Sequence, residues 1–374
     1  MKKSKTSLRK LIVTSTKKEG TPLFLISKNK LLEQLKRFKV CLPRVKPFYA
    51  VKANSHPFIV KTFADAGIGF DVASLQEIDM VLKMGVNPDR LVFANTVKNV
   101  EALRFAASHK VNLMTFDSEY ELNKIAKYAP RARVLIRIKV PNVGSIVELS
   151  LKFGAEPADA IPFLIKAYQL GLKPVGVSFH VGSQSTNVQN YLDALEMASI
   201  IFKDAKLKHL PLDILDIGGG FPITHFGYET DLFGPMSIHI NQELNRLFSP
   251  DIDIIAEPGR VMVGPTCILV MKVIGKSIRD NKHWYYLDDG VYGSLSGLVY
   301  DHCNYHYQVM KRGIPQITTL AGPTCDSFDI ISTSEDLPEL EIGDLIYVES
   351  IGAYSLATAT NFNGIPPAKV VAIP

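Results

Sequence analysis

The stretch Val175-Gly176-Val177-Ser178-Phe179 is a short apolar run that leads directly into His180-Val181-Gly182-Ser183. Similar runs recur between about residues 47 and 260, with helix-like segments between them. None alternates strictly between polar and apolar residues, which is typical of parallel strands buried on both faces. The other seven runs are 48–51, 70–73, 91–94, 113–116, 134–138, 214–217 and 252–256.

The segments between these runs have the pattern of amphipathic helices. Leu75, Ile78 and Leu82 share one helical face, and two capping boxes, 74–77 and 118–121, start with Ser and end with Glu. Eight strand-helix units over about 220 residues predict a (β/α)8 barrel, an α/β fold of about 250 residues. An open, doubly wound parallel sheet is the alternative architecture.

The pattern changes after residue 265. Apolar runs at 267–271, 284–287, 345–348 and 370–373 are separated by Gly, Asp and Asn, with little helical pattern. This predicts a second, all-β domain, which the early run 22–26 could join. We therefore expect a barrel domain over residues 29–265 and a β domain built from residues 1–28 and 266–374.

Composition restricts the function. The 374 residues are 47% apolar and carry a net charge of +5, with no basic patch interleaved with aromatic residues. Nucleic acid and membrane are therefore not expected partners. The four cysteines lie far apart, which fits a reducing, cytoplasmic location. His302-Cys303-x-x-His306 has no fourth ligand at zinc spacing, so no metal is expected.

Barrel enzymes place their active sites at the carboxyl ends of the strands. The first run ends at Lys52, which could be either an ordinary charge reaching water or a desolvated amine suited to a Schiff base. His180, taken alone, could be a satisfied core group or could stack on a flat cofactor.

Two further strand ends suggest a cofactor. Gly218-Gly219-Gly220 would let backbone N–H groups approach an anion closely, but it is neither a dinucleotide fingerprint nor a Walker A loop. Glu257 follows the eighth run. Together with a Schiff-base lysine and a phosphate cup, this acid could face the pyridine nitrogen of pyridoxal 5'-phosphate (PLP) and keep the ring protonated, which favours decarboxylation.

Six motifs, in this order along nearly the whole chain, resemble a known family: YAVKAN (49–54), FHVGSQS (179–185), DIGGGFP (216–222), EPGR (257–260), GPTCDSFD (322–329) and GAYS (352–355). They are similar to those of the PLP-dependent decarboxylases of alanine-racemase-like fold, and best fit ornithine decarboxylases of the eukaryotic type. The resemblance implies a homodimer with two active sites shared between subunits.

The resemblance also implies roles for individual residues. Lys52 would form the Schiff base, Glu257 would face the ring nitrogen, His180 would stack on the ring, and Cys325 of the other subunit would reprotonate Cα. The other implied cofactor-binding residues are Asp71, Arg137, Ser183, Gly219, Gly220, Arg260 and Tyr354.

Substrate specificity is expected to depend on a short acid. Asp301, next to Tyr300, occupies the segment where ornithine decarboxylases carry Asp and arginine-preferring relatives tend to carry Glu. Asp326 would bind the substrate's distal amine. We expect ornithine to be converted to putrescine in polyamine biosynthesis. Lysine is a plausible second substrate, because apolar packing discriminates one methylene by only about 1–3 kcal/mol. Lys152 would pair with Asp329 across the dimer.

Other functions are weaker fits. Diaminopimelate decarboxylases usually have Glu after the Cys, where this chain has Asp326, and they carry an Arg-rich substrate segment that is absent around Tyr300. A racemase would require Arg in place of Glu257. A non-catalytic regulatory homologue is disfavoured because Lys52, Glu257 and Cys325 are all retained.

Overall fold

A computed structural model describes residues 2–145, 152–224 and 230–374. The chain divides into two compact units. One contains Leu32–Thr224 and Thr230–Met262, and the other contains Met1–Leu31 and Val263–Pro374. Among the described residues, no helix has the length and apolar character needed to cross a membrane, and no cluster of three or more His, Cys, Asp or Glu side chains could hold a metal ion.

The first unit contains a closed barrel of eight parallel strands, in which β9 pairs with β2 to complete the ring. The predicted (β/α)8 barrel is therefore confirmed, and the open sheet is wrong. The barrel strands are β2 (Val45–Ala50), β3 (Gly69–Val72), β4 (Leu91–Phe93), β5 (Leu113–Phe116), β6 (Arg133–Ile138), β7 (Lys173–Phe179), β8 (Ile214–Asp216) and β9 (Asp253–Ala256).

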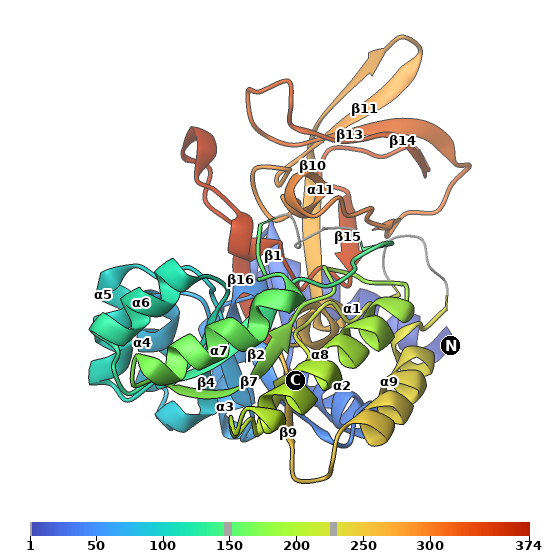
Figure 1. Ribbon diagram of the computed structural model, residues 1–374. Coiled ribbons are helices and arrows are strands. Elements are labelled where there is room, and N and C mark those ends of the chain that lie inside the picture. Colours follow the sequence, from blue (N-terminus) through green and yellow to red (C-terminus); the bar gives the residue numbers. More distant parts are fainter. Residues whose placement is uncertain (1, 146–151, 225–229) are drawn as a thin grey trace. The chain divides into compact units, whose positions relative to one another are not determined.

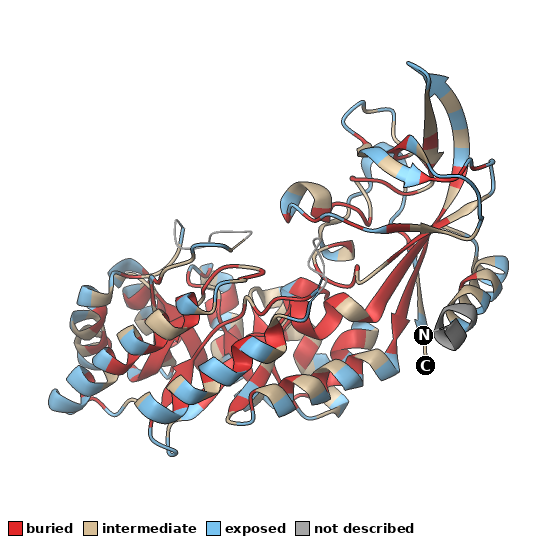
Figure 2. Ribbon diagram, turned by 90° about the vertical axis from the view of Figure 1, so that its right-hand side faces the viewer, coloured by how far each residue is buried: buried red, intermediate tan, exposed pale blue. Residues whose placement is uncertain are grey.

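Helices alternate with these strands and surround them (Figure 1). They bury one face against the strands, and the strands themselves are almost entirely buried (Figure 2). The helices are α2 (Lys28–Cys41), α3 (Pro57–Asp65), α4 (Leu75–Lys83), α5 (Val100–Ser108), α6 (Glu119–Tyr128), α7 (Ala160–Gln169), α8 (Gln189–Leu207), α9 (Phe233–Leu247) and α10 (Arg260–Val263).

The two predicted capping boxes start helices as expected, but only in the first does the glutamate accept a hydrogen bond from the backbone just before the helix. Ser74 caps α4 by accepting from the Glu77 backbone N–H at 3.2 Å, and Glu77 accepts from the Ala73 N–H at 2.6 Å. Ser118 caps α6 in the same way, at 3.4 Å. The Glu121 carboxylate instead lies between two lysines: Oε1 is 3.4 Å from Nζ of the buried Lys98, and Oε2 is 2.6 Å from Nζ of Lys124 on the same helix.

The second unit is mostly β. One path of hydrogen-bonded strands runs β12-β15-β10-β11-β13-β14, and β1 pairs with both β10 and β16. The strands are β1 (Leu23–Ser27), β10 (Cys267–Arg279), β11 (Lys282–Leu287), β12 (Tyr307–Val309), β13 (Gln316–Ala321), β14 (Ile330–Leu337), β15 (Leu345–Glu349) and β16 (Lys369–Ile373), with a short helix α11 (Gly297–Tyr300).

Besides the short α11, this unit differs from the all-β prediction because its first residues form helix α1 (Lys2–Glu19). Ile12 on this helix is fully buried and packs with Leu23 and Ile268 of the sheet, and Leu8 joins the same cluster. Leu8 and Ile12 are four residues apart, so they share one face of the helix. The charged residues between them obscured this face in the sequence.

Candidate active site

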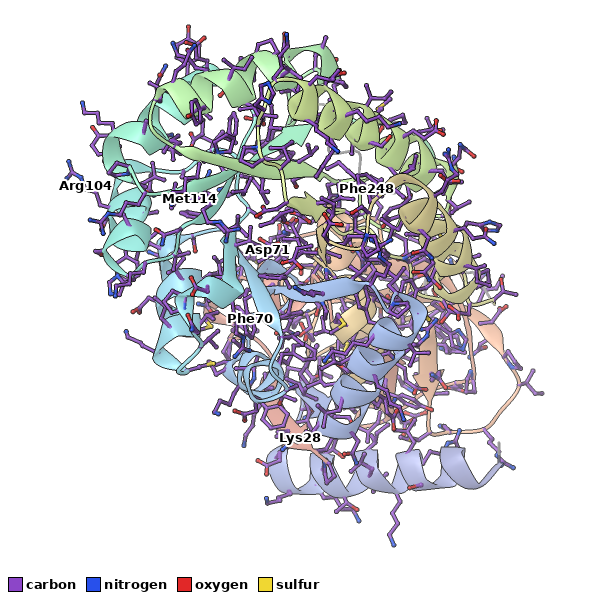
Figure 3. The ribbon with its side chains drawn as sticks, turned by 60° about the horizontal axis from the view of Figure 1, so that its bottom comes forward. Lys28, Phe70, Asp71, Arg104, Met114 and Phe248 are labelled. Carbon is purple, nitrogen blue, oxygen red and sulfur yellow. The ribbon has the colours of Figure 1, made fainter. Side chains whose placement is uncertain are left out.

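Lys52 and Asp71 form the centre of the site in the barrel unit. Lys52 lies in the short 3-10 helix η1 (Val51–Ala53), directly after β2. Its Nζ is 2.5 Å from Oδ2 of Asp71, which follows Phe70 on β3 (Figure 3). The Asp71 side chain is 1% exposed, whereas that of Lys52 is 43% exposed. The buried carboxylate therefore holds the amine in position, and the exposed part of the lysine side chain remains accessible to a ligand.

Two more acids lie at neighbouring strand ends. Glu257 follows β9, and Asp216 is the last residue of β8. Burial raises the pKa of Glu257 well above its usual range, and the negative charges of Asp216 and Asp71 add to the effect. Burial also raises the pKa of Asp216 to about 6, although Asp216 accepts hydrogen bonds from Ser178 Oγ and the Gly218 N–H. Of the two acids, Glu257 therefore has the stronger tendency to hold a proton.

His180 follows β7 and is held in one orientation. Its Nδ1 accepts from the Gly182 N–H at 3.0 Å, so the proton of the neutral ring belongs on Nε2. Burial lowers the pKa of His180 well below its usual range, and the positive charges of Arg137 and Lys52 lower it further. The imidazole is therefore neutral at physiological pH, which suits a flat group that packs on a ring.

The three glycines after β8 form a turn that no side chain could enter. Gly218 has φ +63, and Gly220 has φ +98 with a would-be Cβ only 2.2 Å from the Gly182 carbonyl oxygen. A Cβ on Gly219 would lie 2.6 Å from the Glu257 carbonyl oxygen and 3.1 Å from His180 Nε2. The turn therefore brings its backbone directly against the Glu257 backbone and the His180 imidazole.

Other side chains hold this turn in place. Tyr191 donates its hydroxyl to the Gly219 carbonyl at 2.8 Å. Gln184, which is 1% exposed, exchanges hydrogen bonds with the backbone of Ile223 at 2.8 and 3.1 Å. The loop that carries Ser183 is thereby fixed beside the glycines.

Arg260 and Arg137 bring positive charge to the same ends of the strands. Arg260 donates from Nη2 to Ser183 Oγ at 3.0 Å, which places a guanidinium beside the glycine turn. Arg137, on β6, lies over the Phe153 ring at 5.2 Å. The exposed Lys152 lies over the same ring at 5.0 Å.

The remaining predicted residues belong to the β unit. Cys325 is exposed, with its backbone N–H donating to Asn363 Oδ1 at 3.1 Å. Asp326 accepts a short hydrogen bond from the Tyr292 hydroxyl, which lowers the pKa of Asp326 and raises that of Tyr292 to about 12. Asp329 is buried and accepts from the Val291 N–H and from Thr324.

The specificity segment has its own local structure. Tyr300 ends α11 and is exposed, whereas the next residue, Asp301, is 5% exposed. Oδ2 of Asp301 accepts from Cys303 Sγ at 3.2 Å. Tyr354 has a left-handed backbone, with φ +53, which is rare for a bulky residue and tends to occur at functional sites.

Residues 28–264 match the family model described as "Pyridoxal-dependent decarboxylase, pyridoxal binding domain". The chain belongs to the pyridoxal-dependent decarboxylases. Its residues fit the cofactor, because the barrel presents a lysine amine and a glycine turn beside an arginine. Among the described residues, Oε1 of Glu257 is buried without a hydrogen-bond partner, and so is Oδ1 of Asp71.

Named relatives of this decarboxylase act on basic amino acids. It is 40% identical over 356 residues to the lysine/ornithine decarboxylase of Selenomonas ruminantium, covering 95% of this chain and 90% of the relative. It is also 40% identical over 367 residues to the ornithine decarboxylase of Schizosaccharomyces pombe, covering 94% and 83%.

Solved structures agree with these sequence relatives. The Selenomonas ruminantium lysine decarboxylase in complex with PLP and cadaverine superposes with a TM-score of 0.92 at 39% identity, covering 97% of this chain and 93% of that one. The arginine decarboxylase of Paramecium bursaria Chlorella virus gives 0.93 at 34% identity, covering 98% and 100%. This decarboxylase is therefore a PLP-dependent enzyme of the basic amino-acid group, as the motifs predicted.

Several residues that build the site were given no role from the sequence. Asp216 stands inside the quoted DIGGGFP motif, and its position as an acid at the end of an apolar strand was the available signal. Glu77 looked like a capping residue only, yet burial raises its pKa to about 7, and the charges of Asp71 and Lys52 act on it. Gln184 stands inside the quoted FHVGSQS motif, but the motif does not show its bonding to Ile223. Tyr191 and Tyr292 gave no signal, because their partners are distant in sequence.

Proposed function

We propose that this decarboxylase converts L-ornithine to putrescine, and L-lysine to cadaverine more slowly, as a step of polyamine biosynthesis. The observation that carries the substrate assignment is Asp301, a buried short acid oriented by Cys303. A short acid leaves room for a terminal ammonium to bind directly or through water. The named ornithine and lysine/ornithine relatives support the same assignment.

In this proposal the barrel residues hold the cofactor. PLP, when bound, accepts the electron pair released at Cα as carbon dioxide leaves. Lys52 would bind the cofactor covalently and, at 43% exposure, remains within reach of a substrate amine. Glu257, whose pKa is raised, would share its proton with the ring nitrogen through the buried Oε1. The neutral His180 would pack on the ring.

The phosphate would bind where backbone N–H groups and a cation converge. Gly219 and Gly220 would let the phosphate approach the backbone closely. Arg260 would supply a positive charge, and Ser183, which is hydrogen-bonded to it, a hydroxyl. Tyr354 would contribute from the β unit, and its left-handed backbone marks a constrained position. Asp71 would orient Lys52, and Arg137 would help to keep His180 neutral.

We further propose a cytoplasmic homodimer with shared sites. Residues 29–265 would be the PLP-binding domain, and residues 1–28 and 266–374 the second domain. Cys325 of one subunit would protonate Cα in the other subunit's site, with Tyr300 lining the substrate pocket and Asp326 binding the distal amine. Lys152 and Asp329 would pair between subunits. None of the four cysteines forms a disulfide, in keeping with a reducing compartment.

The direct test is carbon dioxide release from purified protein with added PLP, run in parallel on L-ornithine, L-lysine, L-arginine and meso-diaminopimelate. Preference for ornithine, with lysine second, is expected. Activity only on arginine or diaminopimelate would overturn the role of Asp301 and retain the decarboxylase. Absence of activity on all four would favour a non-catalytic regulatory homologue.

Shared sites are tested by mixing two inactive proteins, Lys52→Ala and Cys325→Ala. Random reassortment gives half heterodimers with one intact site each, so about a quarter of wild-type activity should return. The separate proteins, incubated alone, are the control. No recovery after verified subunit exchange would place both residues in the same subunit.

A further inference from the structure

The end of the barrel opposite the candidate active site contains a cavity of about 530 Å³. It is lined by the first residues of the strands, including Val45, Leu113, Ile214 and Asp253. Sites for small molecules in proteins usually measure about 300–1,000 Å³. The cavity is therefore large enough for a small organic molecule, and none of the residues proposed to bind PLP or substrate lines it.

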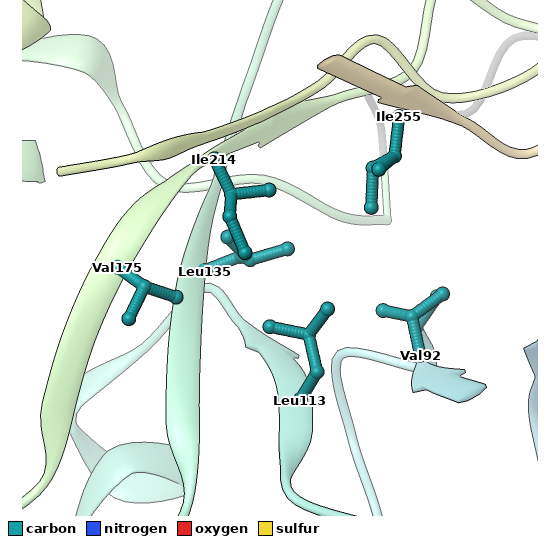
Figure 4. Packing of buried hydrophobic residues seen from close by; sticks show 7 residues of the cluster. Val92, Leu113, Leu135, Val175, Ile214 and Ile255 are labelled. Carbon is teal, nitrogen blue, oxygen red and sulfur yellow. The ribbon is translucent and has the colours of Figure 1, made fainter. Parts of the chain in front are cut away.

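The floor of this cavity is apolar. Leu113, Ile214 and Ile255 belong to the cluster of side chains that fills the barrel interior, where they point toward a common space (Figure 4). Phe48 packs against this cluster and is only partly buried. Its ring lies so close to Gly69 that a Cβ there would approach the ring to 2.5 Å. The floor thus offers aliphatic and aromatic surface to an apolar ligand.

The rim of the cavity is charged, with an excess of cations. Two of them have acidic partners: Lys46 Nζ is 2.6 Å from Asp253 Oδ1, and Arg133 Nη2 is 3.9 Å from Asp213 Oδ1. Ion pairs this exposed contribute only about 0–1 kcal/mol each, so a ligand can compete for these cations. The lining contains four cationic side chains, Lys39, Lys46, Arg90 and Arg133, and two acidic ones, Asp89 and Asp253.

The other two cations differ in how firmly they are placed. Arg90 is fixed, because its Nε donates to the Ile68 carbonyl at 3.0 Å and its Nη2 to the Ala64 carbonyl at 3.2 Å. Lys39 is exposed on α2 and makes no ion pair with any described residue. A fixed guanidinium and a lysine without a carboxylate partner are suited to an anionic group at the mouth.

From this arrangement we propose that the cavity binds a small organic anion, with an aromatic or branched aliphatic body on the floor and a carboxylate or sulfonate at the rim. The lining carries a net charge of +2, from four cations and two acids, and the adjoining Asp213 reduces this to +1, so the mouth still disfavours cationic ligands such as diamines. The site is independent of the decarboxylase chemistry, because it lies at the amino-terminal ends of the strands.

The experiment uses the PLP-loaded protein and the anionic dye 8-anilinonaphthalene-1-sulfonate. Fluorescence titration should show saturable binding at one site per chain. The double variant Lys39→Gln/Arg133→Gln removes two rim cations and should weaken this binding by about tenfold or more. The matched control, Lys36→Gln/Arg131→Gln, removes the same charge from exposed positions on or next to the same two elements, outside the cavity, and should bind as wild type does.

A neutral dye of similar shape, N-phenyl-1-naphthylamine, tests the charge preference and should bind more weakly than the sulfonate. Equal dye affinity in the two double variants would overturn the assignment to this cavity. Equal affinity of the neutral and anionic dyes for the wild type would overturn the choice of an anion. All substituted side chains are exposed or half-buried, and a melting temperature equal to wild type confirms that each variant is folded.

Discussion

Replacing Gly219 by alanine is expected to weaken PLP binding. The new Cβ would lie 2.6 Å from the Glu257 carbonyl oxygen, where ordinary contacts begin at about 3.4 Å, so one of the two segments must shift by about 0.8 Å. The carbonyl belongs to the backbone and cannot rotate away, and His180 Nε2, at 3.1 Å, restricts the other direction. Overpacking of this kind costs about 1–3 kcal/mol. Because the shift displaces the turn that is proposed to hold the phosphate, we expect this cost to appear in PLP binding, as about 5- to 150-fold in affinity.

The assay is a PLP titration of the apoprotein, followed by visible absorbance and compared with wild type. Gly275→Ala on β10 is the matched control. Its backbone is also outside the left-handed region, and its Cβ would meet Tyr286 at an ordinary 3.4 Å. Gly219→Ala that folds normally and binds PLP with wild-type affinity would refute the proposed place of the glycine turn at the cofactor.

Three other substitutions test separate parts of the molecule. Glu121→Gln should destabilise the fold by about 3–5 kcal/mol, because it leaves the buried Lys98 with no carboxylate partner; urea unfolding measures this. Glu77 has a folded-state pKa of about 7 against 4.5 as its ordinary value, so it contributes stability below pH 4.5 that is lost as the pH rises through about 7. Wild type should therefore lose stability relative to Glu77→Gln over that range, as urea unfolding at several pH values would show. Cys303→Ala should raise KM for ornithine by about fivefold with little change in kcat, because Asp301 loses a hydrogen-bond donor.

Each of these has a matched control. Glu119→Gln, an exposed acid on the same helix as Glu121, should leave the urea midpoint unchanged. Glu33→Gln, exposed on α2, should show the pH dependence of wild type, whereas Glu77→Gln should show a smaller loss of stability between pH 4.5 and 7. Cys303→Ser retains a donor and should restore KM toward wild type. Equal behaviour of test and control in any pair contradicts the corresponding reasoning.

The barrel could be predicted from sequence because its signal is local and repeated. Each strand is a short apolar run, and each residue at a strand end, such as Lys52, Glu257 or His180, follows its run directly. Closure then brings these ends together at one side of the barrel. Knowing the strands was therefore enough to predict that these side chains meet.

The features that the sequence did not predict depend on contacts between residues far apart in the chain, which the local spacing of residue types does not indicate. The turn of Glu121 toward Lys98 pairs residues 23 apart, and it replaces a capping interaction that the local pattern favoured. The hydrogen bond from Tyr292 to Asp326 joins two loops of the β unit. The cavity at the amino-terminal strand ends forms where side chains do not fill the space, and no pattern of residues in the sequence predicts it.

The strand β1 has a consequence for how the chain folds during synthesis. Its five residues, Leu23–Ser27, are all buried, between β10 on one side and β16 on the other. Ser27 leaves the ribosome 240 residues before Cys267, the first residue of β10. At translation rates of about 5–20 residues per second, this apolar strand waits about 12–48 seconds for its first partner. The last barrel strand, β9, ends at Ala256, 11 residues before Cys267, so all eight barrel strands are available only in about the last 0.5–2 seconds of this wait. For most of the interval the nascent chain therefore carries an unpaired apolar strand beside an incomplete barrel, a state that is prone to aggregation.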